Sequence, residues 1–63
     1  MYKVGDIVRV IGRECGHEFA IGQKVRVTIL DEDGEIWECE SLDRRESWIM
    51  DEDEVEPVLS LVD

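Results

Sequence analysis

The chain has 63 residues, of which 43% are hydrophobic, and 17 acidic side chains against 7 basic ones give it a formal net charge of −10. A chain this short forms one domain at most and buries only about 60% of its unfolded surface, which argues against a deep catalytic cleft. The hydrophobic content excludes full disorder, and the sequence shows neither a membrane-spanning run nor a secretion signal, so we expect a cytoplasmic protein without membrane contact.

Apolar and polar residues alternate along three segments, residues 5–12, 24–29 and 36–40. Such alternation is typical of antiparallel strands that have one buried face and one solvated face. We therefore predict a strand in each segment. The residues predicted to face inward are Val8, Val10, Val25, Val27, Ile29, Trp37 and Cys39.

Turn-forming residues separate these segments. Residues 12–22 form a long loop bounded by glycines, and its Phe19 and Ile21 are predicted to pin it to the core. The dipeptide Asp33-Gly34 lies between two alternating segments and predicts a tight two-residue hairpin turn. Residues 42–45 predict a second turn.

The last part of the chain is predicted to hold two more strands. Residues 47–50 form the first of them, and residues 51–54, too short and too charged for a full helix, predict a single 3₁₀ turn. Residues 55–59 form the last strand. Pro57 must lie at an edge or a strand end, because proline cannot donate to a ladder.

Specific segments resemble the SH3-like small barrels. Residues 50–57 are similar to that family's strand, 3₁₀ turn and Val-x-Pro ending, residues 34–39 to its central strand, and residues 5–10 to the opening of related KOW modules. The whole chain is also similar to uncharacterised small bacteriophage proteins. The resemblance implies one all-β domain over residues 1–63, a five-stranded SH3-like barrel with a long loop after strand 1 and a 3₁₀ turn before the last strand.

The residues by which such families bind their ligands are absent. The place of the SH3 groove tryptophan falls on Ile36, that of the 3₁₀ tyrosine on Glu54, and that of its proline on Asp51, so binding of proline-rich peptides is not expected. KOW modules often contact RNA through basic loops, which the charge of this chain opposes. We interpret the basic residues as solvated strand and loop positions and expect no direct nucleic-acid binding; they are Arg9, Arg13, Lys24 and Arg26.

Candidate chemical groups are few. Residues 15–18 place Cys15, His17 and Glu18 close in sequence, but the chain has no second histidine, and four ligands or a base with its orienting group are needed for zinc or nucleophilic catalysis. Residues 31–35 are acidic, but their glycine is not at the position that an EF-hand requires. We expect no enzyme activity, no cofactor and no metal site, and both cysteines reduced, with Cys39 in the core.

Charge is unevenly distributed along the chain. Residues 1–30 hold five basic and three acidic side chains, whereas residues 31–63 hold two basic and fourteen acidic ones. We therefore predict a non-enzymatic module that docks on a protein with a basic surface. The residues predicted to bind the partner are Glu38, Glu40, Glu46, Trp48, Asp51, Glu52, Asp53, Glu54 and Glu56, with Trp48 as an exposed aromatic anchor.

Two alternatives stay open at this point. Carboxylates in rows on a β surface could imitate DNA phosphates, which would make the chain an inhibitor of a nucleic-acid-binding protein. The resemblance to KOW modules would instead indicate an RNA- or ribosome-associated module. An open sheet edge would also allow a homodimer by strand pairing.

Overall fold

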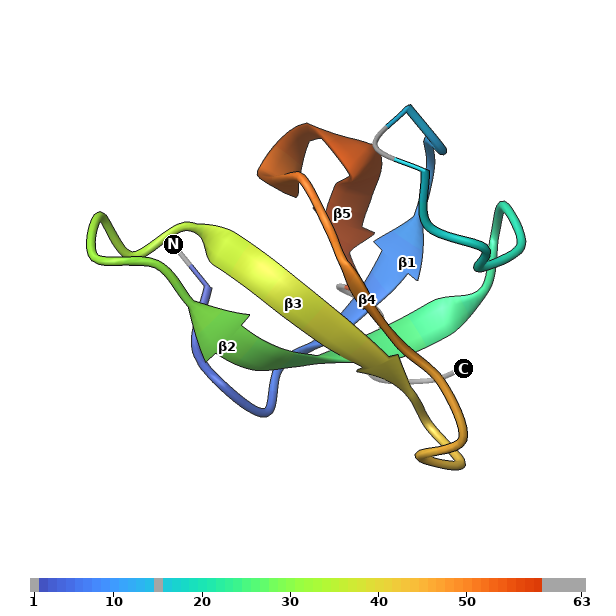
Figure 1. Cartoon of the computed structure of the whole chain (residues 1–63), viewed down its shortest axis with the longest axis horizontal. Helices are drawn as coiled ribbons and strands as arrows, with labels where there is room; N and C mark the ends of the chain where they lie inside the picture. Colours follow the sequence, from blue (N-terminus) through green and yellow to red (C-terminus); the bar gives the residue numbers. More distant parts are fainter. Residues whose placement is uncertain (1, 15, 59–63) are drawn as a thin grey trace.

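Five strands and one 3₁₀ turn form the fold in the computed structural model, which describes residues 2–14 and 16–58 (Figure 1). In chain order the elements are β1 (Ile7–Val10), β2 (Lys24–Leu30), β3 (Ile36–Ser41), β4 (Ser47–Ile49), η1 (Glu52–Glu54) and β5 (Val55–Pro57). The predicted all-β class, the long loop after the first strand and the 3₁₀ turn before the last are confirmed.

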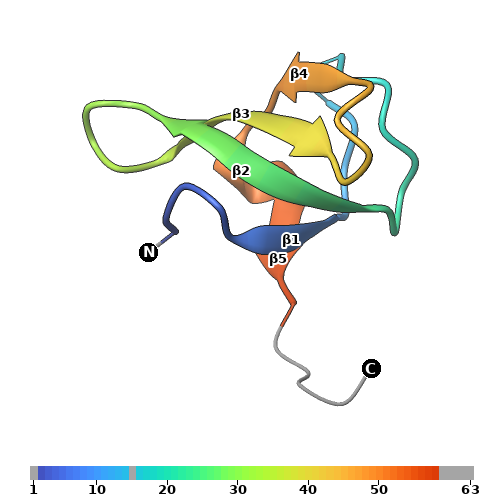
Figure 2. The ribbon, with the colours of Figure 1, turned by 90° about the horizontal axis from the view of Figure 1, so that it is seen from below.

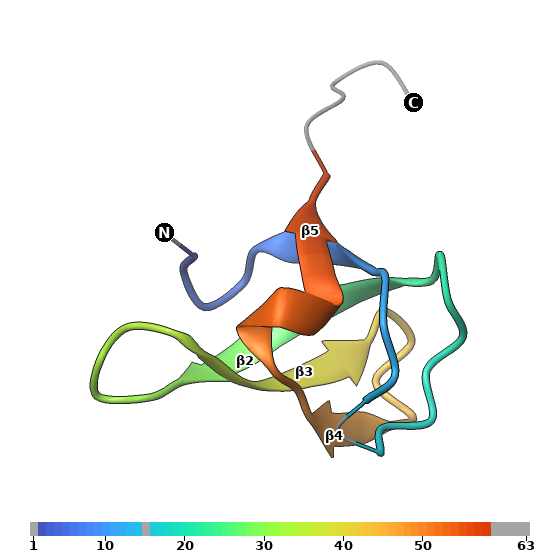
Figure 3. The same cartoon turned by 90° about the horizontal axis from the view of Figure 1, so that it is seen from above.

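The strands make one antiparallel sheet in the order β4-β3-β2-β1-β5. β4 and β5 are its two edges, and no ladder between them closes it within the described residues. Figure 2 shows β4 and β5 on opposite sides of β2, and Figure 3 shows η1 leading directly into β5. Pro57 ends this edge strand, where its missing N–H costs no hydrogen bond to a neighbour on the far side.

The core lies on the inner face of the sheet. It is formed by inward side chains that face each other across neighbouring strands. Such pairs are Val8 with Val25, Val10 with Val55, and Val27 with Cys39. The inward positions predicted for Val8, Val10, Val25, Val27 and Cys39 are confirmed. The complete buried apolar set is Val8, Val10, Phe19, Val25, Val27, Ile36, Cys39, Met50 and Val55, with Tyr2, Leu30 and Trp48 packed against it.

The inward positions predicted for Ile29 and Trp37 are wrong, because these side chains are 44% and 50% exposed. The β2–β3 register contains two irregularities, with Ile29 opposite Glu38 but Leu30 opposite Ile36. β2 has one extra residue between Val27 and Ile29, and β3 has one between Ile36 and Glu38. Each extra residue shifts the inward–outward alternation of its strand by one position, so Ile29 and Trp37 point to the outer face. Ile36 therefore occupies the core place predicted for Trp37.

The long loop, residues 11–23, is anchored by Phe19 and His17. Both side chains are buried, whereas Ile21 is 58% exposed, so the prediction is confirmed for Phe19 and wrong for Ile21. The Nδ1 of His17 accepts from the Phe19 N–H at 3.2 Å, and its Nε2 bonds the carbonyl oxygen of Gly12. Both ring nitrogens thus hold the loop backbone. Cys15 lies outside the described residues.

The β2–β3 turn is longer than the predicted two-residue hairpin. The Asp31 N–H donates to the Glu35 carbonyl oxygen at 2.8 Å, and the Gly34 N–H donates to the Asp31 carbonyl oxygen at 3.0 Å. Gly34 follows this β-turn with φ +84°, the left-handed position that ends a three-residue hairpin loop. The sequence signal located the turn correctly but not its type.

Candidate functional site

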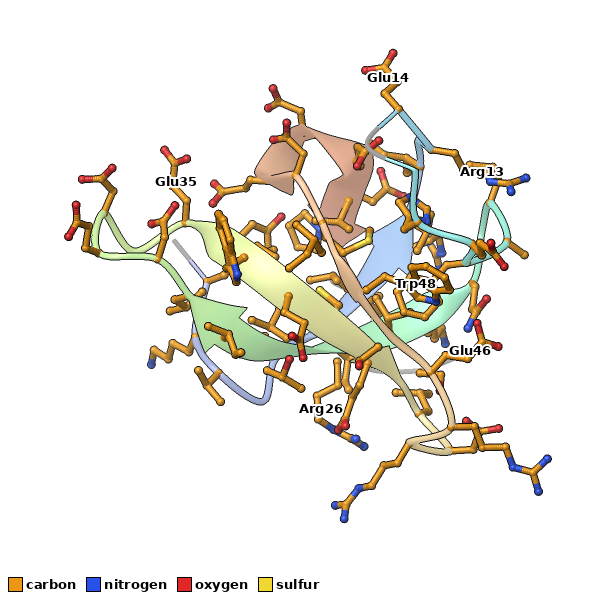
Figure 4. The ribbon with its side chains drawn as sticks, in the orientation of Figure 1. Arg13, Glu14, Arg26, Glu35, Glu46 and Trp48 are labelled. Atoms are coloured by element: carbon orange, nitrogen blue, oxygen red, sulfur yellow. The ribbon has the colours of Figure 1, made fainter. Side chains whose placement is uncertain are left out.

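The predicted partner-binding residues do not form one surface. Glu38 and Glu40 lie on β3, Glu56 lies on β5, and the acids of residues 51–54 belong to η1 and its cap. Figure 4 shows Glu46 and Trp48 on the side of the molecule opposite Glu35. The surroundings of the predicted acidic residues differ: some are paired with arginines, one is buried, and others form no ion pair within the described residues.

Glu40 and Glu56 are compensated by arginines on the neighbouring strands and in the β3–β4 turn. An Arg26 nitrogen lies 2.7 Å from the Glu40 carboxylate, with Arg44 at 4.0 Å, and Arg9 lies 3.5 Å from Glu56. Such surface pairs contribute little stability. They do reduce the negative charge that the outer face of the sheet offers to a partner.

Glu54 does not belong to an exposed acidic surface, because it is only 2% exposed. It completes a capping box around η1, in which the Asp51 N–H donates to Glu54 Oε1 at 3.4 Å and the Asp53 N–H donates to Asp51 Oδ1 at 3.3 Å. Its carbonyl oxygen also accepts from the Ile11 N–H at 2.7 Å. Glu54 thus ties the 3₁₀ turn to the chain that leaves β1, which corrects its predicted role in partner binding.

Trp37, which was predicted to face inward, is exposed, and Trp48, the candidate exposed aromatic residue, is partly buried. Trp48 lies opposite Cys39 and packs against the core, and its Nε1–H donates to Glu46 Oε1 at 3.1 Å. Trp37 is the exposed one. The adjacent apolar pair Ile36-Trp37 carried the missing signal, because two consecutive strand residues cannot both face the core.

Acids of two distant segments meet at one end of the molecule. The Ile36 N–H donates to Glu52 Oε2 at 3.2 Å, which holds η1 against the start of β3. Asp31 Oδ1 accepts from the Asp33 and Glu35 N–H groups, both at 2.9 Å, and shapes the β2–β3 turn beside it. We call this region the acidic end and define it as Asp31, Glu32, Asp33 and Glu35 of the turn with Asp51, Glu52 and Asp53 of η1 and its cap.

The acidic end borders a surface hollow of about 260 Å³. Its acidic lining comes from both segments, and its apolar lining comes from β3, β4 and the residue after β4. The lining residues are Asp31, Glu35, Asp51 and Glu52 with Ile36, Trp37, Ile49 and Met50. Carboxylates and apolar groups therefore lie next to each other on one surface.

Negative charge accumulates at this end. The pKa of Glu35 is raised, chiefly by the carboxylate of Glu52 and then by that of Asp31. Among the described residues, no basic side chain forms an ion pair with an acid of the acidic end. The acids of residues 31–35 were not among the predicted partner-binding residues, because their segment was interpreted only as a hairpin turn.

The other reactive groups serve the fold. Cys39 is fully buried, and burial raises the pKa of its thiol to about 12. Both nitrogens of His17 bond the loop backbone. Within residues 2–14 and 16–58, no group of three or more potential ligands is placed to hold a metal ion.

Comparison with known proteins found no match to a protein family, a curated protein or a solved structure. In the part of the chain that the structure describes, no helix is long and apolar enough to cross a membrane.

Proposed function

We propose that this chain is a non-enzymatic protein-binding module, an SH3-like barrel that docks on a basic surface of another protein through its acidic end. The strand number, the long loop after β1 and the 3₁₀ turn before β5 support the barrel. The resemblance to small bacteriophage proteins favours a host or phage protein as the partner.

One observation carries the proposal, namely the contrast between the acidic end and the other surface acids. Glu40 and Glu56 are offset by arginines within the chain, whereas the carboxylates of Glu52 and Asp31 raise the pKa of Glu35, and no acid of the acidic end forms an ion pair within the described residues. An uncompensated cluster attracts an opposite charge over several ångströms and speeds association with a basic protein. The acidic end is therefore the surface best suited to a basic partner.

The two alternatives draw less support from this geometry. A DNA mimic needs unpaired carboxylates in rows along the sheet, and the arginine pairs of Glu40 and Glu56 interrupt such rows. A KOW-like RNA module needs available basic groups, and Arg9 and Arg26 are engaged in those same pairs. Both alternatives predict binding that differs from docking on a protein through the acidic end.

A capture experiment with two charge-matched variants tests the proposal. The test variant, Glu32→Gln with Glu35→Gln and Asp53→Asn, removes three charges of the acidic end whose side chains make no hydrogen bond within the described residues. The control variant, Glu14→Gln with Glu18→Gln and Glu46→Gln, removes three charges outside the acidic end, and Figure 4 shows Glu14 and Glu46 far from Glu35. Glu46 was itself predicted to bind the partner, so this variant also separates the acidic end from that prediction, and glutamine there keeps an oxygen that can accept from the Trp48 Nε1–H.

Immobilised wild-type and variant proteins are exposed to a lysate of the source cell in rising salt, and the bound proteins are quantified by mass spectrometry. We expect a basic protein that the wild type and the control variant retain, that the test variant loses, and that salt releases. Equal retention by both variants would overturn the proposal. Release of the bound protein by double-stranded DNA would instead support the DNA-mimic alternative.

A further inference from the structure

Three large apolar side chains are exposed on the outer face of β2, β3 and β4. Ile29, Trp37 and Ile49 are 44%, 50% and 48% exposed. Glu38 lies opposite Ile29 on one side and opposite Ile49 on the other, so the two isoleucines flank it in one row across three strands. Trp37 lines a hollow with Ile29 and a second hollow with Ile49. We call Ile29, Trp37 and Ile49 the outer apolar face.

Irregular strand pairing creates this face. Regular alternation would turn Ile29 and Trp37 into the core, and the two register shifts between β2 and β3 turn them outward. A large apolar side chain left exposed does not contribute the stability that its burial would give, and so small a domain has little stability in reserve. Bulges that re-aim side chains in this way are common beside functional sites, and contiguous exposed apolar residues mark interaction surfaces.

The acidic end forms the rim of the outer apolar face. Asp31, Glu35, Asp51 and Glu52 line the hollow that contains Trp37 and Ile49. Asp31 and Glu32 line the hollow that contains Ile29 and Trp37. No basic residue lines either hollow, which makes the surface both apolar and negatively charged.

This combination determines the chemistry of the occupant. A second copy of the chain would bring two acidic rims together, because each copy carries a net charge of −10. Nucleic acid and anionic lipid surfaces would meet the same repulsion. A protein segment with lysines or arginines around an apolar side chain complements both properties, since the Trp37 ring can also take part in a cation–π contact.

We propose, resting on the proposed function, that the outer apolar face receives an apolar side chain of a basic partner segment while the acidic end binds the lysines or arginines beside it. Trp37 is the anchor of this contact, because a half-exposed tryptophan inside a polar rim has the properties of an interface hot spot. The acidic end then sets the rate and salt dependence of association, and the outer apolar face sets the lifetime of the complex.

The test uses two synthetic peptides as probes. One is rich in lysine with leucine at alternate positions, and the other has serine in place of each leucine. Binding to the isotope-labelled chain is followed by amide chemical shifts, with wild type, Trp37→Thr and Ile49→Thr as the proteins. Ile21→Thr is the matched control, because Ile21 is exposed to a similar degree, 58%, but lies in the long loop.

We expect the leucine peptide to shift amides of β3 and β4 and to lose about tenfold in affinity with Trp37→Thr or Ile49→Thr, but not with Ile21→Thr. The serine peptide should bind more weakly and respond to none of these substitutions. This inference would be overturned if the leucine peptide bound no more tightly than the serine peptide and bound Trp37→Thr as tightly as wild type. Docking through the acidic end would then remain intact. Binding that also persists in the Glu32→Gln, Glu35→Gln, Asp53→Asn variant would overturn the proposed function as well.

Discussion

The N–H of Ile36 donates to Oε2 of Glu52, and this 3.2 Å hydrogen bond connects the first residue of β3 with the first residue of η1. It brings the acids of the 3₁₀ turn next to those of the β2–β3 turn. The same Glu52 carboxylate is the main cause of the raised pKa of Glu35. One side chain therefore both joins the two segments and produces the charge repulsion between them.

Two substitutions at Glu52 separate these effects. Glu52→Ala leaves the N–H of the buried Ile36 without its acceptor and should reduce the free energy of unfolding by about 1–3 kcal/mol. Glu52→Gln keeps an acceptor oxygen and removes the charge, so its loss should be much smaller. Urea denaturation measures both values. Equal losses in the two variants would show that the hydrogen bond does not stabilise this contact.

The repulsion around Glu35 makes a prediction about pH. The folded-state pKa of Glu35 is raised, so the folded protein holds the proton more tightly and loses stability as pH rises from the ordinary glutamate pKa through the raised one. Glu35→Gln should therefore raise the melting temperature at neutral pH and leave it unchanged at acid pH, where the carboxyl is protonated in both states.

Thermal denaturation across pH measures this difference, with Glu18→Gln as the control because Glu18 lies in the long loop. Added salt should diminish the gain at neutral pH by screening the repulsion. A gain of the same size at acid pH would contradict a charge-based cause.

The alternation of apolar residues predicted the strands and most of their inward positions, but it assigned Ile29 and Trp37 to the wrong face. Two irregularities that compensate each other lie between Val27 and Leu30, so the pair Val25–Ser41 at one end of the β2–β3 pairing and the pair Leu30–Ile36 at the other end share the same register. The adjacent apolar pairs Ile29-Leu30 and Ile36-Trp37 indicate a break in the alternation, but the sequence does not show which member of each pair faces the core. This is why Ile29 and Trp37 were assigned to the wrong face.

The sequence predicted that the candidate site would be acidic, but it did not predict which acidic residues would come together to form it. The excess of acids after residue 30 is evident in the sequence, and Asp51, Glu52 and Asp53 lie where an acidic surface was expected. The contribution of Asp31 and Glu35 depends on the tertiary contact between Ile36 and Glu52, which are 16 residues apart in sequence, and local patterns do not report such a contact. The burial of Glu54 likewise follows from its capping of η1 against the chain after β1.

Burial of Cys39 predicts slow thiol chemistry. Its pKa of about 12 and its complete burial mean that a thiol reagent reaches a reactive thiolate only when the domain opens. In a Cys15→Ser background, labelling of Cys39 should be slow under native conditions and complete at once in guanidinium chloride. With a chromogenic thiol reagent, the absorbance of the released leaving group follows the reaction. Fast native labelling would contradict the core position of Cys39.

The β3–β4 turn contains a strained residue. Among the described residues, Arg44 is the one non-glycine residue with a positive φ, +65°. The left-handed region costs a side-chain-bearing residue about 1–2 kcal/mol relative to glycine. Arg44→Gly should therefore increase the free energy of unfolding by about 0.5–1 kcal/mol, after the added freedom of the unfolded chain is subtracted. Arg45→Gly is the control, and urea denaturation should show no gain for it.

His17 holds the long loop through both of its ring nitrogens. Its side chain is 2% exposed, and it connects the Phe19 N–H with the carbonyl oxygen of Gly12. His17→Ala should leave both backbone groups unbonded and create a cavity beside Phe19, at a cost of about 2–4 kcal/mol. A small domain has little stability in reserve, so the variant can be too unstable for a complete denaturation curve. Hydrogen exchange of the Phe19 amide is therefore measured as well, because it reports the loop directly. Glu18→Ala is the control, because Glu18 is an exposed residue of the same loop, and in this variant the Phe19 amide should exchange as slowly as in the wild type. An unchanged exchange rate in His17→Ala would contradict the role of the imidazole as the loop's internal bridge.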